Sequence, residues 1–100
     1  MKKHAKTQLT VVTEAVLERS LVREVRELGA QAWFVGEVHG GSRDGERGGD
    51  WEADRSIELR VICDEAVADA IAAHVLARYA PHYNVAMSFA EVQVLRPERY

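Results

Sequence analysis

Hydrophobic and polar residues alternate in four stretches of the chain, which is the pattern of strands with one buried face. In the clearest stretch, Ile57, Leu59 and Val61 alternate with residues that are mostly charged. Another stretch, AWFVGEVH, is rich in the aromatic and β-branched residues that favour strands. Strands are therefore predicted over residues 7–13, 32–39, 56–63 and 84–95.

Two further stretches, residues 14–29 and 65–79, repeat their hydrophobic residues at the spacing of a helix. The predicted apolar stripes are Leu17, Leu21, Val25 and Leu28 in the first helix, and Val67, Ile71, Val75 and Leu76 in the second. Thr13 and Asp64 precede the two helices as predicted N-caps. Gly29 is placed to end the first helix in the left-handed conformation.

The order strand, helix, strand, strand, helix, strand predicts an α+β fold. Each strand–helix–strand unit implies a right-handed crossover between parallel strands. Two such units give a four-stranded antiparallel sheet with two helices on one face, which is the ferredoxin-like βαββαβ arrangement. A length of 100 residues suits one domain, residues 1–100. Many unrelated activities share this fold, so it does not by itself indicate a function.

Composition and charge narrow the classes of function. A hydrophobic fraction of 47% and a charged fraction of 29% are ordinary for a soluble globular protein. The net charge of -3 argues against a general nucleic-acid binder, which would carry a basic face. No stretch approaches the ~18 apolar residues that span a membrane. Cys63 is the only cysteine, so no internal disulfide can form. A cytoplasmic protein that is not embedded in a membrane is expected.

The sheet face turned away from the helices is predicted to be small and partly apolar. If Leu9, Val11, Val85, Met87 and Phe89 point inward, the outward residues are Thr10, Val12, Glu58, Arg60, Ile62, Ala86, Ser88 and Ala90. A face turned to solvent would carry more Lys and Glu. Two interpretations stay open: an interface with another subunit, which patch reasoning favours, and a surface that merely tolerates small residues.

The glycine-rich connection of residues 40–55 is too long for a simple hairpin. Such a hairpin needs ~2–5 residues, and loops longer than ~12–15 residues are usually functional or disordered. Gly40 and Gly41 permit positive φ and open amides, Ser42 adds a hydroxyl donor, and Arg43 adds a guanidinium fork. These four residues have the parts of a phosphate cradle, although the stretch is neither a P-loop nor GxGxxG. The alternative is a flexible, solvated hairpin.

Four motifs carry a resemblance to a known family. They are VVTE at the end of the first strand, GGSR after the second, WEADR before the third, and YNVA at the opening of the fourth. With the segments around them, they resemble the PII-like signalling proteins over nearly the whole chain. More narrowly, they are similar to the branch encoded near bicarbonate transporters and carboxysomes.

The resemblance implies a homotrimer that binds adenine nucleotide in clefts between subunits and has no catalytic activity. Residues 40–55 correspond to the T-loop, which changes order with ligand and contacts a partner, here a membrane bicarbonate transporter or a carboxysome component. The implied nucleotide-binding residues are Gly40, Gly41, Ser42, Arg43, Arg55, Arg60 and Ala86. For Arg60 the alternative is an ion pair with Glu58 or with a neighbouring subunit. For Ala86 the alternative is simple sheet packing.

Two departures from PII proteins outside this branch narrow the implied ligand. Those proteins hold ATP phosphates with a loop rich in glycine and lysine, where this chain has ARYAPHYN. They are also uridylylated on a tyrosine, and residues 40–55 contain none. ADP or AMP is therefore the implied ligand, with ATP, cyclic AMP and bicarbonate as further candidates, and no tightly bound cofactor or metal is expected.

Two other functions that occur on this fold need residues that this sequence does not have. An acylphosphatase or another phosphate-handling enzyme of this fold needs a phosphate loop directly after the first strand, and VVTEAV has neither the glycines nor the arginine. An RNA-binding module would need exposed aromatic residues on the central strands and a basic face. A different small-molecule-binding regulatory module is the remaining alternative.

Overall fold

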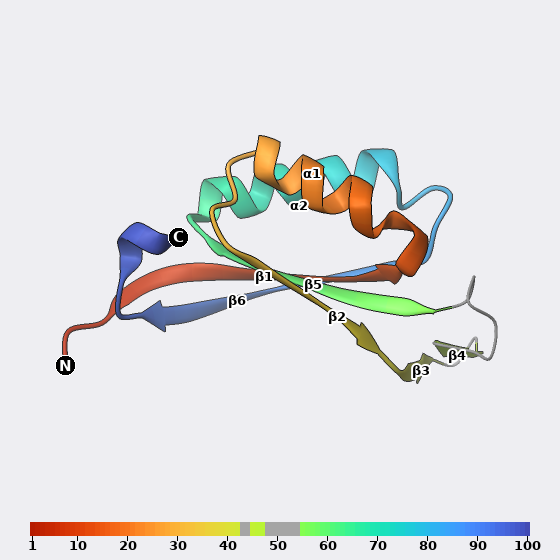
Figure 1. Ribbon diagram of the computed structural model, residues 1–100, viewed down its shortest axis with the longest axis horizontal. Coiled ribbons are helices and arrows are strands. Elements are labelled where there is room, and N and C mark those ends of the chain that lie inside the picture. Colours follow the sequence, from red (N-terminus) through yellow and green to blue (C-terminus); the bar gives the residue numbers. More distant parts are fainter. Residues whose placement is uncertain (43–44, 48–54) are drawn as a thin grey trace.

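A computed structural model of the protein describes residues 1–42, 45–47 and 55–100 (Figure 1). In chain order the elements are β1 (His4–Glu14), η1 (Ala15–Leu17), α1 (Glu18–Glu27), β2 (Trp33–Val38), β3 (Gly40–Ser42), β4 (Gly45–Arg47), β5 (Ser56–Cys63), α2 (Glu65–Arg78), β6 (Val85–Val94) and η3 (Pro97–Arg99). The elements η1 and η3 are short 3-10 helices.

The main sheet has the strand order β2-β5-β1-β6, and every neighbouring pair is antiparallel. Both long helices lie on one face of this sheet, and the opposite face is uncovered in the single chain (Figure 1). This is the ferredoxin-like α+β fold that the order of elements predicts. Both chain ends lie at one end of the sheet, and the short strands β3 and β4 lie at the other.

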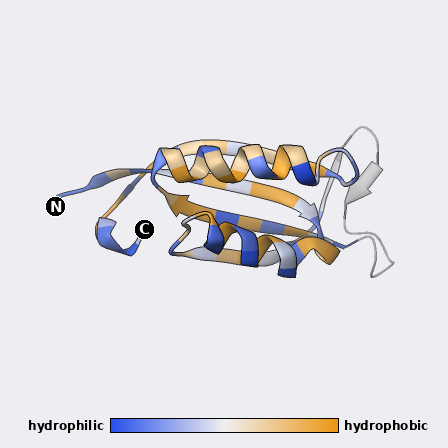
Figure 2. Ribbon diagram, turned by 90° about the horizontal axis from the view of Figure 1, so that it is seen from above, coloured by the Kyte–Doolittle hydropathy of each residue, from blue (hydrophilic) through white to orange (hydrophobic). Residues whose placement is uncertain are grey.

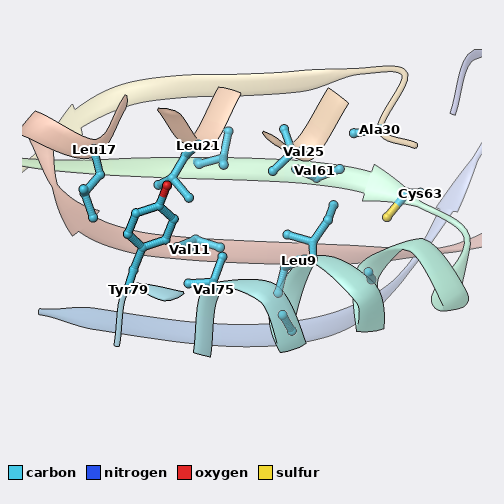
Figure 3. Packing of buried hydrophobic residues seen from close by; sticks show 14 residues of the cluster. Leu9, Val11, Leu17, Leu21, Val25, Ala30, Val61, Cys63, Val75 and Tyr79 are labelled. Atoms are coloured by element: carbon cyan, nitrogen blue, oxygen red, sulfur yellow. The ribbon is translucent and has the colours of Figure 1, made fainter. Parts of the chain in front are cut away.

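The core fills the space between the helix layer and the sheet. Leu9 and Val11 of β1, with Val61 of β5, face the helices and are fully buried, as the alternation predicts (Figure 3). Val75 and Tyr79 close the layer from the side of α2. The buried hydrophobic side chains across these elements give the fold its main stabilisation, at about 25 cal/mol per Å² of apolar surface removed from water.

Three residues that the sequence pattern places inside are more exposed than predicted. Leu28 is 36% exposed and Leu76 is 57% exposed. The buried stripe of α2 follows Ala68, Ile71, Ala72 and Val75. Leu76 lies one residue, or about 100°, beyond Val75 around the helix. Phe89 pairs with Leu9 on the helix-bearing face, yet it is half-exposed because β6 is an edge strand.

The two long helices also differ in how their polarity is distributed. Figure 2 shows α2 pale to orange along most of its length, whereas α1 carries more polar blue segments. The difference follows from composition, because α2 is rich in alanine and α1 is rich in Glu and Arg. Alanine permits close approach of α2 to the sheet without requiring a strongly amphipathic sequence.

The predicted capping role of Thr13 is wrong. Strand β1 runs on through Glu14, a 3-10 turn follows, and α1 begins only at Glu18. The Thr13 side chain is fully buried, and its Oγ1 donates to the backbone oxygen of Asn84 at 2.6 Å. A hydroxyl used in this way cannot also cap the helix, so a long-range contact has displaced the local one.

Asp64 does stand immediately before α2, but its carboxylate makes no capping hydrogen bond. Lys6 Nζ donates to Asp64 Oδ1 at 2.6 Å, which ties the start of α2 to β1. The backbone oxygen of Asp64 accepts from the amides of Val67 and Ala68 at 3.0 and 3.1 Å. The residue therefore begins the helix with its main chain and anchors it with its side chain.

Gly29 ends α1 with a φ of 115°, as its predicted left-handed role requires. A Cβ there would stand 3.4 Å from Val67 Cγ2, which is ordinary contact, so the backbone sets the cost of any substitution. We expect Gly29→Ala to lower the free energy of unfolding by about 1–2 kcal/mol, as measured by thermal melting. The control is Gly36→Ala in β2, where an added Cβ meets nothing within 4 Å. Equal melting temperatures for the two variants would contradict the prediction.

Candidate functional site

Three segments that are far apart in the chain meet at the end of the sheet opposite the termini (Figure 1). They are the end of β1, the residue that precedes β5 and the residue that precedes β6. The contacts involve Glu14, Arg55 and Asn84, and we call these three residues the loop end. All three belong to motifs that carry the family resemblance, so one residue from each of three motifs meets at this point.

Short hydrogen bonds hold the loop end together. Glu14 Oε2 accepts from the backbone amide of Asn84 at 2.8 Å. The amide of Ala15 donates to the backbone oxygen of Arg55 at 2.8 Å. With the Thr13 contact described above, the end of β1 and the first residue of η1 are bonded to the segments that enter β6 and β5. The base of the 40–55 connection is therefore fixed against the end of the central strand β1.

Gly40 and Gly41 lie in a small two-stranded sheet that the sequence pattern does not predict. Gly40 pairs with Arg47 and Gly41 with Glu46 in antiparallel register. Among the glycines that the structure describes, only Gly29 has positive φ. An extended ladder differs from the alternating conformations of an anion nest. The phosphate cradle thus stays a prediction, and it requires this ladder to open.

Of the other two residues of the predicted cradle, the structure describes the backbone of Ser42 only. Ser42 is the last residue of β3, where it pairs with Gly45. Arg43 lies outside the residues that the structure describes. The structure therefore neither supports nor contradicts a phosphate contact by these two side chains.

Arg55 and Arg60 each lie beside a carboxylate. Arg55 Nη1 is 2.9 Å from Glu37 Oε1. Arg60 Nε is 3.2 Å from Glu58 Oε1, which is the ion pair that the sequence offered as an alternative role. Both pairs are partly exposed, and such pairs contribute only about 0–1 kcal/mol. A phosphate group could therefore displace the Glu58 carboxylate from Arg60 at little cost.

Arg60 and Ala86 both lie on the uncovered face of the sheet but on different strands. Register places Arg60 opposite Phe34 and Thr10, and Ala86 opposite Val12. The strand β1 separates them. A shallow depression of about 240 Å³ lies beside Arg60, lined by Phe34, Val35, Gly36, Val38, Glu58 and Arg60. The structure thus brings Arg55 to the loop end, and it spreads Arg60 and Ala86 over the open face.

Sequence reasoning missed the contact between Glu14 and Asn84. Both residues stand inside the motifs VVTE and YNVA, but the local pattern favours a helix start for the first motif. Their contact joins residues 70 positions apart. Only the motif resemblance could have pointed to the pair, because no periodicity links them.

Cys63 is a core residue. It is buried at the end of β5. Burial raises the pKa of the Cys63 thiol, and the nearby charge of Asp64 raises it further, against a smaller opposing effect of Lys6. A thiol that stays protonated at neutral pH is a poor nucleophile.

Metal sites and membrane-spanning helices are both absent from the described part of the chain. No three His, Cys, Asp or Glu side chains gather there in an arrangement that could hold a metal ion. None of the helices described is both long enough and apolar enough to cross a membrane.

Comparisons with known proteins place this geometry in a family. Residues 6–99 match the family described as nitrogen regulatory protein P-II. A solved PII-like signalling protein from Thermus thermophilus is 36% identical, and the match covers 100% of this chain and 99% of that chain with a TM-score of 0.85. No curated protein matches the chain.

More distant structures share the fold. CPII from Thiomonas intermedia K12, solved with ADP and bicarbonate, is 14% identical over 98% of this chain and 96% of that chain, with a TM-score of 0.85. The same protein solved with ADP, AMP and acetate is 13% identical over 100% and 98% of the two chains, with a TM-score of 0.83. The family match spans nearly the whole sequence, and the 36% identical relative spans all of it. The chain therefore belongs to the P-II family of regulatory proteins.

Proposed function

We propose that the protein is a cytoplasmic, homotrimeric sensor that binds ADP or AMP in clefts between its subunits. Bicarbonate is the second proposed ligand. Ligand binding changes the conformation of residues 40–55, and this change alters the affinity for a membrane bicarbonate transporter or a carboxysome component. The sensor carries out no reaction of its own. Family membership over residues 6–99 is the observation that carries this proposal.

The uncovered face of the sheet supports the trimer. Phe34 is largely exposed on it at the β2 edge, and the small side chains of Ala86 and Ser88 are exposed on it at the β6 edge. A partly apolar sheet face that is open in the single chain is a typical subunit interface. Packing three chains through this face would cover it and place the loop end of each chain beside a neighbour.

Chemistry at the loop end supports an anionic ligand. Arg55 lies there in a partly exposed ion pair with Glu37. The relative CPII has been solved with ADP, AMP and bicarbonate, although its low identity to this chain shows the fold alone. A nucleoside diphosphate such as ADP offers several phosphate oxygens to guanidinium groups. Such charge-assisted hydrogen bonds are about twice as strong as neutral ones.

Arg43→Ala tests the phosphate contact. Removing one charge-assisted bond to phosphate is expected to weaken ADP binding by about 1.5–3 kcal/mol, or roughly ten- to a hundredfold. Isothermal titration calorimetry measures the dissociation constant. Arg47→Ala is the matched control, because it removes the same side chain from the same connection outside the GGSR motif. An unchanged dissociation constant in Arg43→Ala would place the phosphate elsewhere.

The conformational part of the proposal has its own measurement in the same samples. Hydrogen exchange of the amides in residues 40–55 should slow when ADP is added to the wild-type protein. If ADP binds and these amides exchange at the same rate with and without it, nucleotide does not drive the change. The signal would then have to come from bicarbonate or from the partner.

A further inference from the structure

One carboxylate joins the two long helices to each other. Glu24 of α1 is only 7% exposed. Its Oε2 accepts from Tyr79 Oη at 2.5 Å, and its Oε1 is bonded to His74 Nε2. Arg78 Nε lies 3.5 Å from Oε1, and Arg23 Nη2 lies 3.7 Å from Oε2. Four donor side chains therefore surround a single acidic group.

The charge state of this cluster follows from its contacts. Burial raises the pKa of Glu24, but hydrogen bonds from Tyr79 and His74, and the charges of His74 and Arg78, outweigh that effect and leave the pKa below its ordinary value. Burial, and then the bond to Glu24, raise the pKa of the Tyr79 hydroxyl. The pair is thus an ionised acceptor facing a neutral donor at neutral pH.

An ionic group is an unusual way to pack two helices. Apolar side chains of similar volume often stabilise such a contact at least as well. A carboxylate that needs aligned donors instead favours one relative position of the groups that it joins. Glu24 therefore contributes mainly by fixing the position of α1 relative to His74 and Tyr79.

The connection of residues 80–84 continues from Tyr79, and its backbone donors are fully used. The backbone oxygen of Tyr79 accepts from His82 and Tyr83 at 3.0 and 2.9 Å. Ala80 donates back to α2, and Asn84 donates to Glu14 Oε2 at 2.8 Å. Pro81 has no amide hydrogen. Every N–H group of this connection is therefore bonded, so these contacts set the path of its backbone.

The structure thus contains a continuous path from the helix layer to the loop end. It begins at the Glu24 carboxylate, follows Tyr79 into the connection and reaches Asn84. The amide of Asn84 donates to the Glu14 carboxylate, and the backbone oxygen of Asn84 accepts from the Thr13 hydroxyl. The amide of Ala15, the residue after Glu14, donates a hydrogen bond to the backbone oxygen of Arg55.

We propose that Glu24 is a positioning residue that sets the loop end through Tyr79 and the 80–84 connection. Asn84 passes this position to Glu14 and, across the end of β1, to Arg55. The inference rests on the proposed function only in its effect on nucleotide affinity. Its structural part can be measured in the protein without any ligand.

The first variant is Tyr79→Phe, which keeps the ring and removes the donor to Glu24. Protection of the His82, Tyr83 and Asn84 amides against hydrogen exchange, read by NMR, is expected to fall about tenfold or more. Amides in the centre of β1 and β5 should keep their protection, which separates local loosening from loss of the fold. If ADP binds the wild type, its affinity should fall about fivefold or more.

Matched controls remove comparable groups from outside the cluster. Tyr83→Phe deletes a hydroxyl within the connection itself, and we expect no change in its amide protection. Glu24→Gln is the second variant and should reproduce Tyr79→Phe in part. Glu27→Gln on the same helix, where the side chain is exposed, should behave as wild type. If Tyr79→Phe proves too unstable to study, Glu24→Gln tests the same contact, because it keeps the shape of the Glu24 side chain.

A pH profile distinguishes this role from simple packing. The groups that face Glu24 are Arg23 on α1, His74 and Arg78 on α2, and Tyr79 directly after α2. Because the pKa of Glu24 is lowered in the folded chain, its contribution is present above the unfolded pKa and is lost as the pH falls through the folded pKa. The melting temperatures of wild type and Glu24→Gln should therefore converge as the solution is acidified.

Two results would overturn the inference. One is unchanged exchange of the 82–84 amides in a folded Tyr79→Phe or Glu24→Gln protein. The other is a difference in melting temperature between wild type and Glu24→Gln that does not shrink in acid. Absence of ADP binding to the wild type, together with the expected exchange pattern, would instead refute the proposed nucleotide function and support the positioning role.

Discussion

Ser88→Arg is expected to convert the proposed trimer into monomers and to remove the proposed ADP binding at micromolar concentration. Ser88 is exposed on the uncovered sheet face, in register with Thr10, and Arg60 lies on the next strand in the same row. A long cation placed there would be buried against a neighbouring subunit without a partner and would add to the charge of Arg60. Leaving a buried charge unpaired costs about 3–5 kcal/mol, which corresponds to more than a hundredfold in assembly.

Sedimentation equilibrium gives the mass directly. Wild type should sediment at about three times 11.2 kDa and the variant at 11.2 kDa. Ala70→Arg is the control, because it introduces the same side chain at an exposed position of α2, on the opposite side of the molecule. A trimeric Ser88→Arg protein that still binds ADP would show that subunits meet elsewhere, and a monomeric wild type would remove the site between subunits.

Leu21→Ala is expected to lower the free energy of unfolding by about 2–5 kcal/mol, the range for a leucine removed from a packed core. Leu21 lies on the buried face of α1, and its side chain is fully buried in the core. The same change at Leu76 should cost less than about 1 kcal/mol, because most of that side chain already contacts water. Both leucines lie in helices, so the intrinsic helix preference of the substitution cancels in the comparison.

Urea unfolding at one fixed protein concentration measures both variants, since association of subunits adds to apparent stability. Similar losses for Leu21→Ala and Leu76→Ala would mean that Leu76 is covered in the assembled protein. The sequence-based stripe would then describe the trimer better than it describes the single chain.

Periodicity predicts the elements of this protein well because the local pattern and the final packing agree. Leu9 and Val11 alternate with polar neighbours and are buried as that alternation predicts. Leu76 is different, because the alanines of α2 move the buried stripe to one side without any loss of helical spacing. Hydrophobicity at a spacing identifies a helix, but it does not fix the rotation of that helix on its sheet.

Side-chain contacts between distant segments are what the sequence pattern does not contain. Thr13 has the chemistry of an N-cap, and a prediction from neighbours assigns that role. The actual acceptor is Asn84, 71 residues away. The bond between Glu24 and Tyr79 likewise spans 55 residues. Arg60 and Glu58 are only two residues apart on one strand face, and their ion pair could be anticipated.

The buried position of Cys63 makes the protein well suited to site-specific labelling. Its single native thiol is enclosed by the core, and the raised pKa keeps that thiol protonated and slow toward maleimides at neutral pH. A cysteine introduced at an exposed position would therefore react selectively, with no need to mutate Cys63. A spin label attached at one such position would report distances between equivalent sites of the assembled chains, with and without ligand.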